Sequence, residues 1–254
     1  MDVLLAVEFD WKLFGERILN GEGVFWEALV TTVYVAVLAQ VLGVALGLVT
    51  ALAARSTAWA LRLLAGAYTL VIRGTPIIVQ IFFVYFGANL FLGFDLFPRE
   101  VDVAGLSISG AIVAGVVALA INEGAYMAEI IRSGIDSVDR GQLEAAQALG
   151  MTRRLGMRRI VLPQAARVIV PPLGNQFNSM IKVTSLLAFI GVYELFQDSQ
   201  VGYSTTFKPV EYFVAVALWY LLLTTIWSLI QMRIERRLAV SDRPDVDVPV
   251  SEAR

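Results

Sequence analysis

The chain of 254 residues contains no cysteine and no histidine, and only 17% of its residues are charged. Without cysteine and histidine it can form no disulfide, no zinc site of the usual kind and no Ser-His-Asp triad. A soluble domain carries about 25% charged residues, so a soluble enzyme is disfavoured. The net charge of −2 offers no basic field for nucleic acid. With 57% hydrophobic residues, the composition excludes disorder and is typical of an integral membrane protein.

Long runs without a charged residue mark the membrane-spanning segments. Four such runs are 20 to 27 residues long, and a fifth begins at Val168 and is broken only by Lys182. A helix needs about 20 apolar residues to cross roughly 30 Å of hydrocarbon. We therefore predict an all-α integral membrane protein with five transmembrane helices. Their expected positions are residues 26–54, 63–92, 106–130, 167–191 and 212–233.

The basic residues predict the orientation of these spans. Of the 20 Lys and Arg residues, 14 fall on one side of the membrane, two lie within spans, and four fall on the other side. Basic residues are enriched in cytoplasmic loops. The N-terminus is therefore expected outside and the C-terminus in the cytoplasm. The four basic residues expected outside are Lys12, Arg17, Arg99 and Lys208.

The two ends of the chain differ from the spans. In the segment 1–23, expected to be extracytoplasmic, Trp11, Phe14 and Ile18 recur at helical spacing, which predicts a short amphipathic helix rather than a signal peptide. This helix either lies on the membrane surface or packs against the bundle. The C-terminal segment 238–254 is rich in Pro, Asp and Val without periodicity, and is expected to be a disordered cytoplasmic tail.

The cytoplasmic connection between the third and fourth spans, about residues 132–166, has a pattern of its own. Residues 142–149 are strong helix formers, and Gly150 is a typical C-terminal cap. A second helical piece is expected to begin after Thr152, to carry four arginines and to end at Pro163. These two helices either lie on the membrane with their arginines near lipid phosphates, or form a docking surface for a cytoplasmic partner.

A motif in this connection carries a family resemblance. Glu144-Ala145-Ala146 is followed by Gly150, Ile160, Leu162 and Pro163. At every defined position this spacing resembles the EAA loop of permease subunits in bacterial ATP-binding-cassette importers. Further segments resemble the branch of that family that takes up polar amino acids, and together the resemblance covers about residues 24–237. These segments are Arg73-Gly74-Thr75-Pro76 with Gln80, residues 124–130, Gly141-Gln142, residues 163–165 and residues 182–186.

The resemblance implies a multi-pass permease domain over residues 24–237, in the bacterial inner membrane. Its expected partners are a cytoplasmic ATPase dimer, an extracytoplasmic solute-binding protein and a second permease subunit, identical or not. The EAA loop would dock on the ATPase through the seven motif residues. Two departures are Glu123, where many relatives carry a small residue, and Val183, where many carry an acid or amide.

The chain itself has no nucleotide-binding signature. The phosphate-binding pattern G-x-x-x-x-G-K-[ST] is absent, and no Gly-Lys pair occurs anywhere in the sequence. ATP is therefore expected on the partner subunit, and we predict neither an enzyme nor a cofactor or metal site in this chain. The expected function is ATP-driven import of a polar amino acid or a similar zwitterionic solute by alternating access.

Polar side chains within two predicted spans suggest where the solute passes. Charged and polar groups in a span usually face the bundle interior or an aqueous cavity. In the third span they form one stripe, with Glu123 about 100° away from it, and in the fourth they share one helical face. The candidate pathway residues are Asn122, Glu123, Tyr126, Asn175, Asn178, Lys182 and Ser185.

A zwitterion in a membrane needs hydrogen-bond donors for its carboxylate and acceptors for its ammonium group. Lys182 and the two asparagines of the fourth span are candidates for the first task, and Glu123 and Tyr126 for the second. The alternative is a set of internal ion pairs that hold the bundle together. We expect Arg73 and Glu129 to be structural in this sense, with Arg132 available to Glu129 at a spacing of three residues. For Lys182 and Glu123 both interpretations stay open.

A different class of function is also possible. A stand-alone channel or secondary carrier would use the polar stripes as a pore lining and need no ATPase. A patterned cytoplasmic loop brings such a carrier no benefit, and the internal repeats common in secondary transporters are not visible here. A membrane enzyme is disfavoured because no nucleophile and base can be paired without His or Cys.

Overall fold

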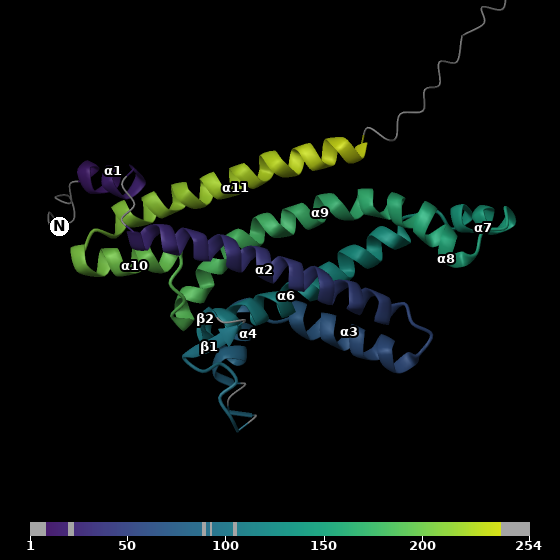
Figure 1. Cartoon of the computed structure of the whole chain (residues 1–254), viewed down its shortest axis with the longest axis horizontal. Helices are drawn as coiled ribbons and strands as arrows, with labels where there is room; N and C mark the ends of the chain where they lie inside the picture. The colour runs from purple at the N-terminus through teal and green to yellow at the C-terminus, as the bar shows by residue number, and fades with distance from the viewer. Residues whose placement is uncertain (1–8, 20–22, 88–89, 92, 104–105, 240–254) are drawn as a thin grey trace, which may run out of the picture.

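The computed structural model describes residues 9–19, 23–87, 90–91, 93–103 and 106–239. Three helices are long and apolar enough to cross a membrane: α2 (Gly23–Ala54), α6 (Gly110–Asp136) and α11 (Pro209–Ala239). Two bent helix pairs also satisfy this test when each counts as one span, which gives the five predicted spans. Figure 1 shows these helices running along the long axis of the molecule, with α1 at one end and α7 and α8 at the other.

The second predicted span, 63–92, is not one helix. Helix α3 (Trp59–Arg73) stops at Gly74, and α4 (Ile77–Phe82) leaves at 109° and continues into a π-helical turn, Phe83–Gly87. Pro76 precedes α4 and lacks the N–H that would extend α3. The amide of Gln80 closes the break, because its Nε2 donates to the carbonyl oxygens of Ile72 at 2.7 Å and Thr75 at 3.1 Å.

The third span begins later than expected. Residues 106–109 were predicted as helix, but they form strand β2 (Leu106–Ser109), which pairs antiparallel with β1 (Glu100–Val103). Apolar and polar residues alternate over these four positions, which is the period of a strand. Helix α6 then begins at Gly110 and continues to Asp136, six residues past the predicted end.

The helix of the fourth span is longer than predicted and includes residues 153–166 of the expected cytoplasmic connection. A continuous helical segment runs through α8 (Arg153–Gly156), a π-helical turn (Met157–Val161), α9 (Leu162–Val183) and a 3-10 helix (Thr184–Ile190). The prediction that a separate helix ends at Pro163 is therefore wrong. The π-helical turn ends at Val161, two residues before Pro163, so the regular hydrogen-bond pattern is already altered where the proline lacks its N–H.

Two further prolines, Pro171 and Pro172, lie inside α9 without ending it. Helix α11 packs along this stretch and supplies donors to its carbonyl groups. Gln231 Nε2 donates to the Pro171 carbonyl at 3.2 Å, and Trp227 Nε1 donates to the Gly174 carbonyl at 2.8 Å. The two prolines lack the N–H groups that would bond the carbonyls of residues 167 and 168, so the bonds from α11 do not replace the missing ones. They hold the part of α9 that contains the prolines against α11.

Helices α2 and α6 approach closely at the centre of the bundle. A Cβ atom added at Gly43 would lie 2.6 Å from the Cβ of Glu123, so only glycine fits at this position. Small residues at such a crossing let two backbones pack by van der Waals contact, as in other membrane helix pairs. The buried cluster around this crossing includes Val35, Ala39, Ile81 and Leu119.

Helix α1 (Trp11–Leu19) packs against the start of α11 and beside α10 (Leu195–Thr206) (Figure 1). The predicted helix therefore forms, and one of its faces packs on the bundle. Trp11 remains 74% exposed on the other face. Residues 1–8 and 20–22 of the predicted N-terminal segment, and residues 240–254 of the predicted tail, lie outside the described residues, whereas Leu238 and Ala239 belong to α11.

A set of polar contacts, which we call the clasp, holds α1 in place. Lys208 Nζ lies 2.5 Å from Asp10 Oδ2, and the Asp10 backbone N–H donates to Glu211 Oε1 at 2.9 Å. Arg17 forms an ion pair with Asp198 at 3.5 Å. The members of the clasp are Asp10, Arg17, Tyr193, Asp198, Lys208, Glu211 and Tyr212.

Candidate translocation cavity and docking loop

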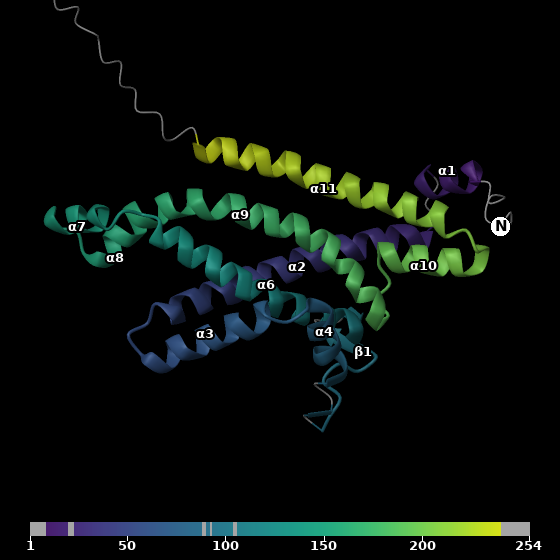
Figure 2. The same cartoon turned by 180° about the vertical axis from the view of Figure 1, so that it is seen from behind.

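A cavity of about 380 Å³ lies between α4, α6 and α9, at the break that follows α3. Three of the predicted pathway residues, all on α6, line it: Asn122, Glu123 and Tyr126. Figure 2 shows α4 close to the end of α3 and to the start of α6. The other lining residues are Thr75, Pro76, Ile77, Gln176, Ser179, Met180 and Val183.

Hydrogen bonds from neighbouring helices fix the polar side chains of α6. Glu123 is only 4% exposed, and its Oε1 accepts a hydrogen bond from Gln40 Nε2 of α2 at 3.0 Å. Asn122 Nδ2 donates to Gln80 Oε1 at 2.9 Å, and Gln80 in turn holds the break before α4. No ion pair joins Glu123 to Arg73 or Lys182 among the described residues, so the carboxylate faces the cavity with an amide as its partner.

The four predicted pathway residues of the fourth span do not line this cavity. Asn178 Nδ2 donates to Ser228 Oγ at 3.1 Å, and Asn175 Oδ1 accepts from Gln231 Nε2 at 3.3 Å, so both asparagines bind α11. Ser185 Oγ donates to the carbonyl of Lys182 in its own helix. Lys182 is exposed and forms no ion pair within the described part of the chain.

The face of α9 that meets the cavity carries Gln176, Ser179 and Val183 instead. These residues are spaced by three and four positions and share a helical face. Sequence reasoning chose the neighbouring polar face, which carries Lys182, the charge that interrupts the uncharged run beginning at Val168. The partner of Glu123, Gln40, was also missed, although a lone amide inside the longest uncharged run was a usable signal.

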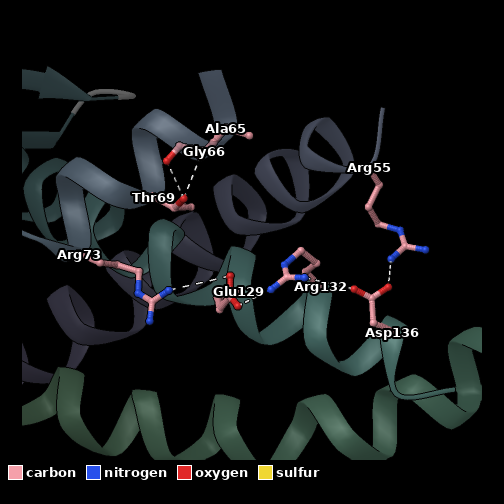
Figure 3. Close-up of polar contacts among 8 residues, drawn as sticks. All are labelled: Arg55, Ala65, Gly66, Thr69, Arg73, Glu129, Arg132 and Asp136. Carbon is pink, nitrogen blue, oxygen red and sulfur yellow. Dashed lines mark hydrogen bonds and ion pairs between the residues drawn. The ribbon is translucent and has the colours of Figure 1, made fainter. Parts of the chain in front are cut away.

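A row of alternating charges follows α6 from the cavity toward the cytoplasmic loop (Figure 3). Arg132 Nη2 lies 2.5 Å from Glu129 Oε1, which confirms the expected pair at a spacing of three residues. Arg73, at the end of α3, lies 3.9 Å from Glu129, so the expected structural pair also forms. At the other end Asp136 is shared by Arg132, at 3.4 Å, and by Arg55, the residue that follows α2.

The predicted docking loop is built around helix α7 (Arg140–Ala148). The Asp139 side chain begins the helix by accepting from the Gly141 backbone N–H at 2.6 Å. Gly150 follows the last turn with a φ of 82°, a left-handed conformation that favours glycine. Thr152 then begins α8, with its Oγ1 accepting from the Leu155 N–H at 3.3 Å. These contacts hold α7 as a short helix that turns back on the long helical segment.

The motif residues of α7 divide between two faces. Ala146 is 1% exposed and packs on α8, where a Cβ added at Gly156 would lie 3.3 Å from the Ala146 Cβ. Glu144 and Ala145 are exposed on the opposite side, and Glu144 has no hydrogen bond or ion pair with any described residue. Leu149 is 83% exposed. Figure 1 shows α7 and α8 at the end of the molecule farthest from α1.

The remaining motif residues lie on the start of the long helical segment. Ile160 is half-buried, and Leu162 and Pro163 are exposed. An open groove of about 850 Å³ runs beside this stretch. Its lining combines arginines with apolar side chains: Thr152, Arg153, Arg154, Leu155, Met157, Arg158 and Leu162. Within the described residues no cluster of three acidic side chains is placed to hold a metal ion.

A helical bundle with up to five spans, an inner polar cavity and a projecting helical loop has the architecture of a membrane permease. The family described as "Binding-protein-dependent transport system inner membrane component" matches residues 43–240. The chain therefore belongs to this family of multi-pass inner-membrane transport subunits.

Individual relatives are similar over most of the chain. The chain is 36% identical to the glutamine transport system permease protein GlnP of Escherichia coli (strain K12), over 92% of this chain and all of that protein. It is 38% identical to the L-cystine transport system permease protein TcyB of Bacillus subtilis (strain 168), covering 92% and 93%. It is 40% identical to the arginine transport system permease protein ArgU of Corynebacterium glutamicum, covering 82% of this chain and 66% of that protein.

Solved structures show the same fold. The structure titled "Crystal structure of an amino acid ABC transporter with histidines" matches with a TM-score of 0.74 and 38% identity, covering 84% of this chain and 94% of that one. An inward-facing structure of the MetNI methionine ABC transporter matches with a TM-score of 0.69. Its identity of 15% restricts that likeness to the fold.

Proposed function

We propose that this chain is the transmembrane subunit of an ATP-driven importer, and that it translocates a polar amino acid or similar zwitterionic solute by alternating access. The observation that carries the proposal is the pairing of two features. A polar cavity inside the bundle is connected by helix α6 to a projecting helix whose exposed Glu144 has no hydrogen bond or ion pair with any described residue. The relatives named for arginine, glutamine and cystine transport support the class of solute.

Conformational changes of the ATPase would be transmitted to this chain through α7. The exposed Glu144 can accept charge-assisted hydrogen bonds, and the exposed Ala145 allows close approach to a cleft of a cytoplasmic ATPase. The left-handed Gly150 keeps α7 folded back on the long helical segment. Closure of an ATPase dimer would then tilt the attached spans as rigid bodies and open the cavity to the other side. ATP stays on the partner, and a binding protein delivers the solute from outside.

The orientation follows from the same assignment. Docking on a cytoplasmic ATPase requires α7 and the basic stretch of α8 to face the cytoplasm, in agreement with the rule that cytoplasmic loops are basic. The N-terminal helix α1, at the opposite end of the bundle, then lies outside (Figure 1). A second permease subunit, identical or homologous, would complete the pathway.

The cavity residues of α6 are proposed to bind the solute. Glu123 offers a buried carboxylate that can accept from an ammonium group, and Tyr126 and Asn122 add polar groups on the same wall. Gln176 and Ser179 face them from α9. Asn175 and Asn178 are assigned instead to the contact between α9 and α11, because their side chains bind that helix. Lys182 and Ser185 lie outside the cavity lining.

Glu123→Gln in the assembled complex tests the binding role. The substitution keeps the shape of the side chain and removes its charge, so we expect about a tenfold or larger rise in the apparent KM for the solute. ATPase assembly should not change, because Glu123 is far along α6 from the docking helix. ATP-dependent uptake into proteoliposomes gives the measurement, with Glu100→Gln on the β-hairpin as a matched control. Unchanged uptake kinetics in Glu123→Gln would remove this residue from the pathway.

A further inference from the structure

The row of charges beside α6 contains one positive charge more than its carboxylates can neutralise. Three guanidinium groups alternate with two carboxylates, so each carboxylate is shared and an arginine stands at both ends (Figure 3). Arg73 and Glu129 lie within the predicted spans, where a charge that is not neutralised is costly and usually has a functional partner. The members in order are Arg55, Asp136, Arg132, Glu129 and Arg73.

The excess charge is located at the Arg73 end. Glu129 already forms an ion pair with Arg132 at 2.5 Å. Its ion pair with Arg73 is longer, at 3.9 Å, and the two side chains form no hydrogen bond. Arg55, at the other end, makes a close contact with Asp136 that is a hydrogen bond as well as an ion pair. The Arg73 guanidinium donates no hydrogen bond to any described residue, although it carries five N–H groups.

Arg73 also lies beside the cavity. Its guanidinium carbon is 5.4 Å from the centre of the Tyr126 ring, and Tyr126 lines the cavity together with Thr75, two residues after Arg73. The Arg73 side chain is 43% exposed, so a small anion can reach it. A guanidinium stacked on an aromatic ring is held in place while its edge stays available for a planar, two-point contact with a carboxylate.

We propose that Arg73 binds the carboxylate of the transported solute in place of its loose contact with Glu129. Glu129 would keep a cationic partner after this exchange, because Arg132 already forms an ion pair with it. The solute would then lie across Tyr126, with its carboxylate at Arg73 and its ammonium group toward Glu123. This assignment rests on the proposed function and adds to it that the permease itself, and not only a binding protein, requires a carboxylate on its solute.

Lys182, the charged group that the sequence suggested for the carboxylate, does not compete for this role. It lies on α9 outside the cavity lining, and the residues of α9 that line the cavity are uncharged. Among the described lysines and arginines of the membrane-spanning helices, Arg73 combines contact with a cavity residue and unused donors.

The test measures whether residue 73 and the solute carboxylate interact. The permease assembled with its ATPase in nanodiscs, without binding protein, is titrated with L-arginine, L-glutamine and L-cystine. Each is compared with its decarboxylated counterpart: agmatine, 4-aminobutanamide and cystamine. For a solute that binds, we expect the wild-type complex to prefer the carboxylate form by about 10- to 100-fold. Arg73→Gln should abolish this preference, with little change in the affinity for the decarboxylated form.

Two variants serve as controls. Arg73→Lys keeps the charge but loses the two-point geometry, so it should retain part of the preference. Arg62→Gln removes an arginine from the opposite end of α3, where it donates to the carbonyls of Ser56 and Thr57, and should leave the preference unchanged. If Arg73 had only a structural role, its replacement would weaken the binding of the carboxylate form and of the decarboxylated form equally.

The outcomes separate this proposal from the function on which it rests. Equal loss of both forms in Arg73→Gln, or an unchanged preference, would overturn the role of Arg73, and the second result would be expected if a carboxylate of the second permease subunit already neutralised it. Binding of none of the three amino acids by the wild-type complex, together with no ATP-dependent uptake of them, would overturn the proposed function and this inference with it.

Discussion

The two ends of the bundle differ in whether their charged side chains have partners among the described residues. At the clasp, Asp198 accepts hydrogen bonds from Tyr193 at 2.7 Å and from Arg17 at 3.5 Å, and Glu211 accepts the backbone N–H of Asp10. At the docking loop, Glu144 has no partner among the described residues, and Leu149 is 83% exposed. Both ends carry helices that pack on the spans, but the clasp pairs its charges with one another, whereas Glu144 pairs with no described residue.

This difference separates structural from functional charges. A buried polar group that is hydrogen-bonded inside the chain contributes to stability, and its loss lowers stability. A charge and an apolar side chain left exposed on a well-capped helix contribute little to folding, so they are available to a partner. Variants at the two ends should therefore have different effects, one on partner binding and the other on unfolding.

The largest effect is expected at the docking loop. Gly150→Val forces a branched side chain into a left-handed conformation, and Glu144→Lys reverses an exposed charge. Each should reduce co-purification of the ATPase at least tenfold, and the loss of ATP-dependent uptake should follow. Thermal unfolding of Glu144→Lys should match the wild type. Glu16→Lys, a reversal of an exposed glutamate on α1, is the matched control. An ATPase retained by both docking variants would refute the docking assignment.

A smaller effect, of the opposite kind, is expected at the clasp. Asp198 has a side chain only 7% exposed, so Asp198→Asn leaves Arg17 and Tyr193 without their charged partner. We expect a loss of about 1.5–3 kcal/mol in the free energy of unfolding in detergent, with unchanged ATPase binding. Tyr193→Phe, which removes one hydrogen bond to Asp198, should cost about 1 kcal/mol. A loss of ATPase binding in either variant would mean that the two ends are not independent.

The smallest effect is a pH dependence of the α1 anchor. The backbone N–H of Leu13, followed by the side chain of Lys208, lowers the pKa of Asp10 below 3.8. The hydrogen bond to Asp10 raises the pKa of Lys208 above 10.5. The stabilisation from Asp10 is therefore fully present above 3.8 and is lost as the pH falls through its lowered pKa. That from Lys208 is fully present below 10.5 and is lost as the pH rises through its raised pKa.

Between these limits the anchor should be insensitive to pH. Hydrogen exchange of the α1 amides, corrected for intrinsic rates, should therefore show constant protection from about pH 5 to 9. Asp10→Asn should lower the protection uniformly across this range. A marked pH dependence near neutrality in the wild type would require another titrating group at this end.

Much of the fold could be predicted because the length of an apolar run indicates a membrane span and the positions of the basic residues indicate its orientation. The spans at 26–54 and 212–233 correspond to α2 and α11, and the helix at Trp11–Leu19 and the cap at Gly150 also form. The breaks in the helices were harder to predict, because whether a proline ends a helix depends on the residues packed around it. Pro76 follows the end of α3, whereas α9 continues through Pro171 and Pro172 and packs there against α11.

The candidate site was predictable on α6 and not on α9. A stripe of Asn122 and Tyr126 beside Glu123 sits on the helix with the most buried surface, so it had to face the interior. Helix α9 has two polar faces, and only the packing of α11 decides which one is used for contact with that helix. Arg73 was expected to pair with Glu129 and does so, but the length of that contact, 3.9 Å, could not be predicted because a sequence gives no distances.

The central claim is that this permease moves solute uphill only through work delivered at the docking helix. The most direct test compares proteoliposomes that contain the permease alone with those that contain the complete complex, including the ATPase, ATP and binding protein. We expect accumulation of L-arginine, L-glutamine or L-cystine against a gradient only with the complete complex, and none when its permease carries Gly150→Val. Accumulation by the permease alone would contradict the account and indicate a stand-alone carrier.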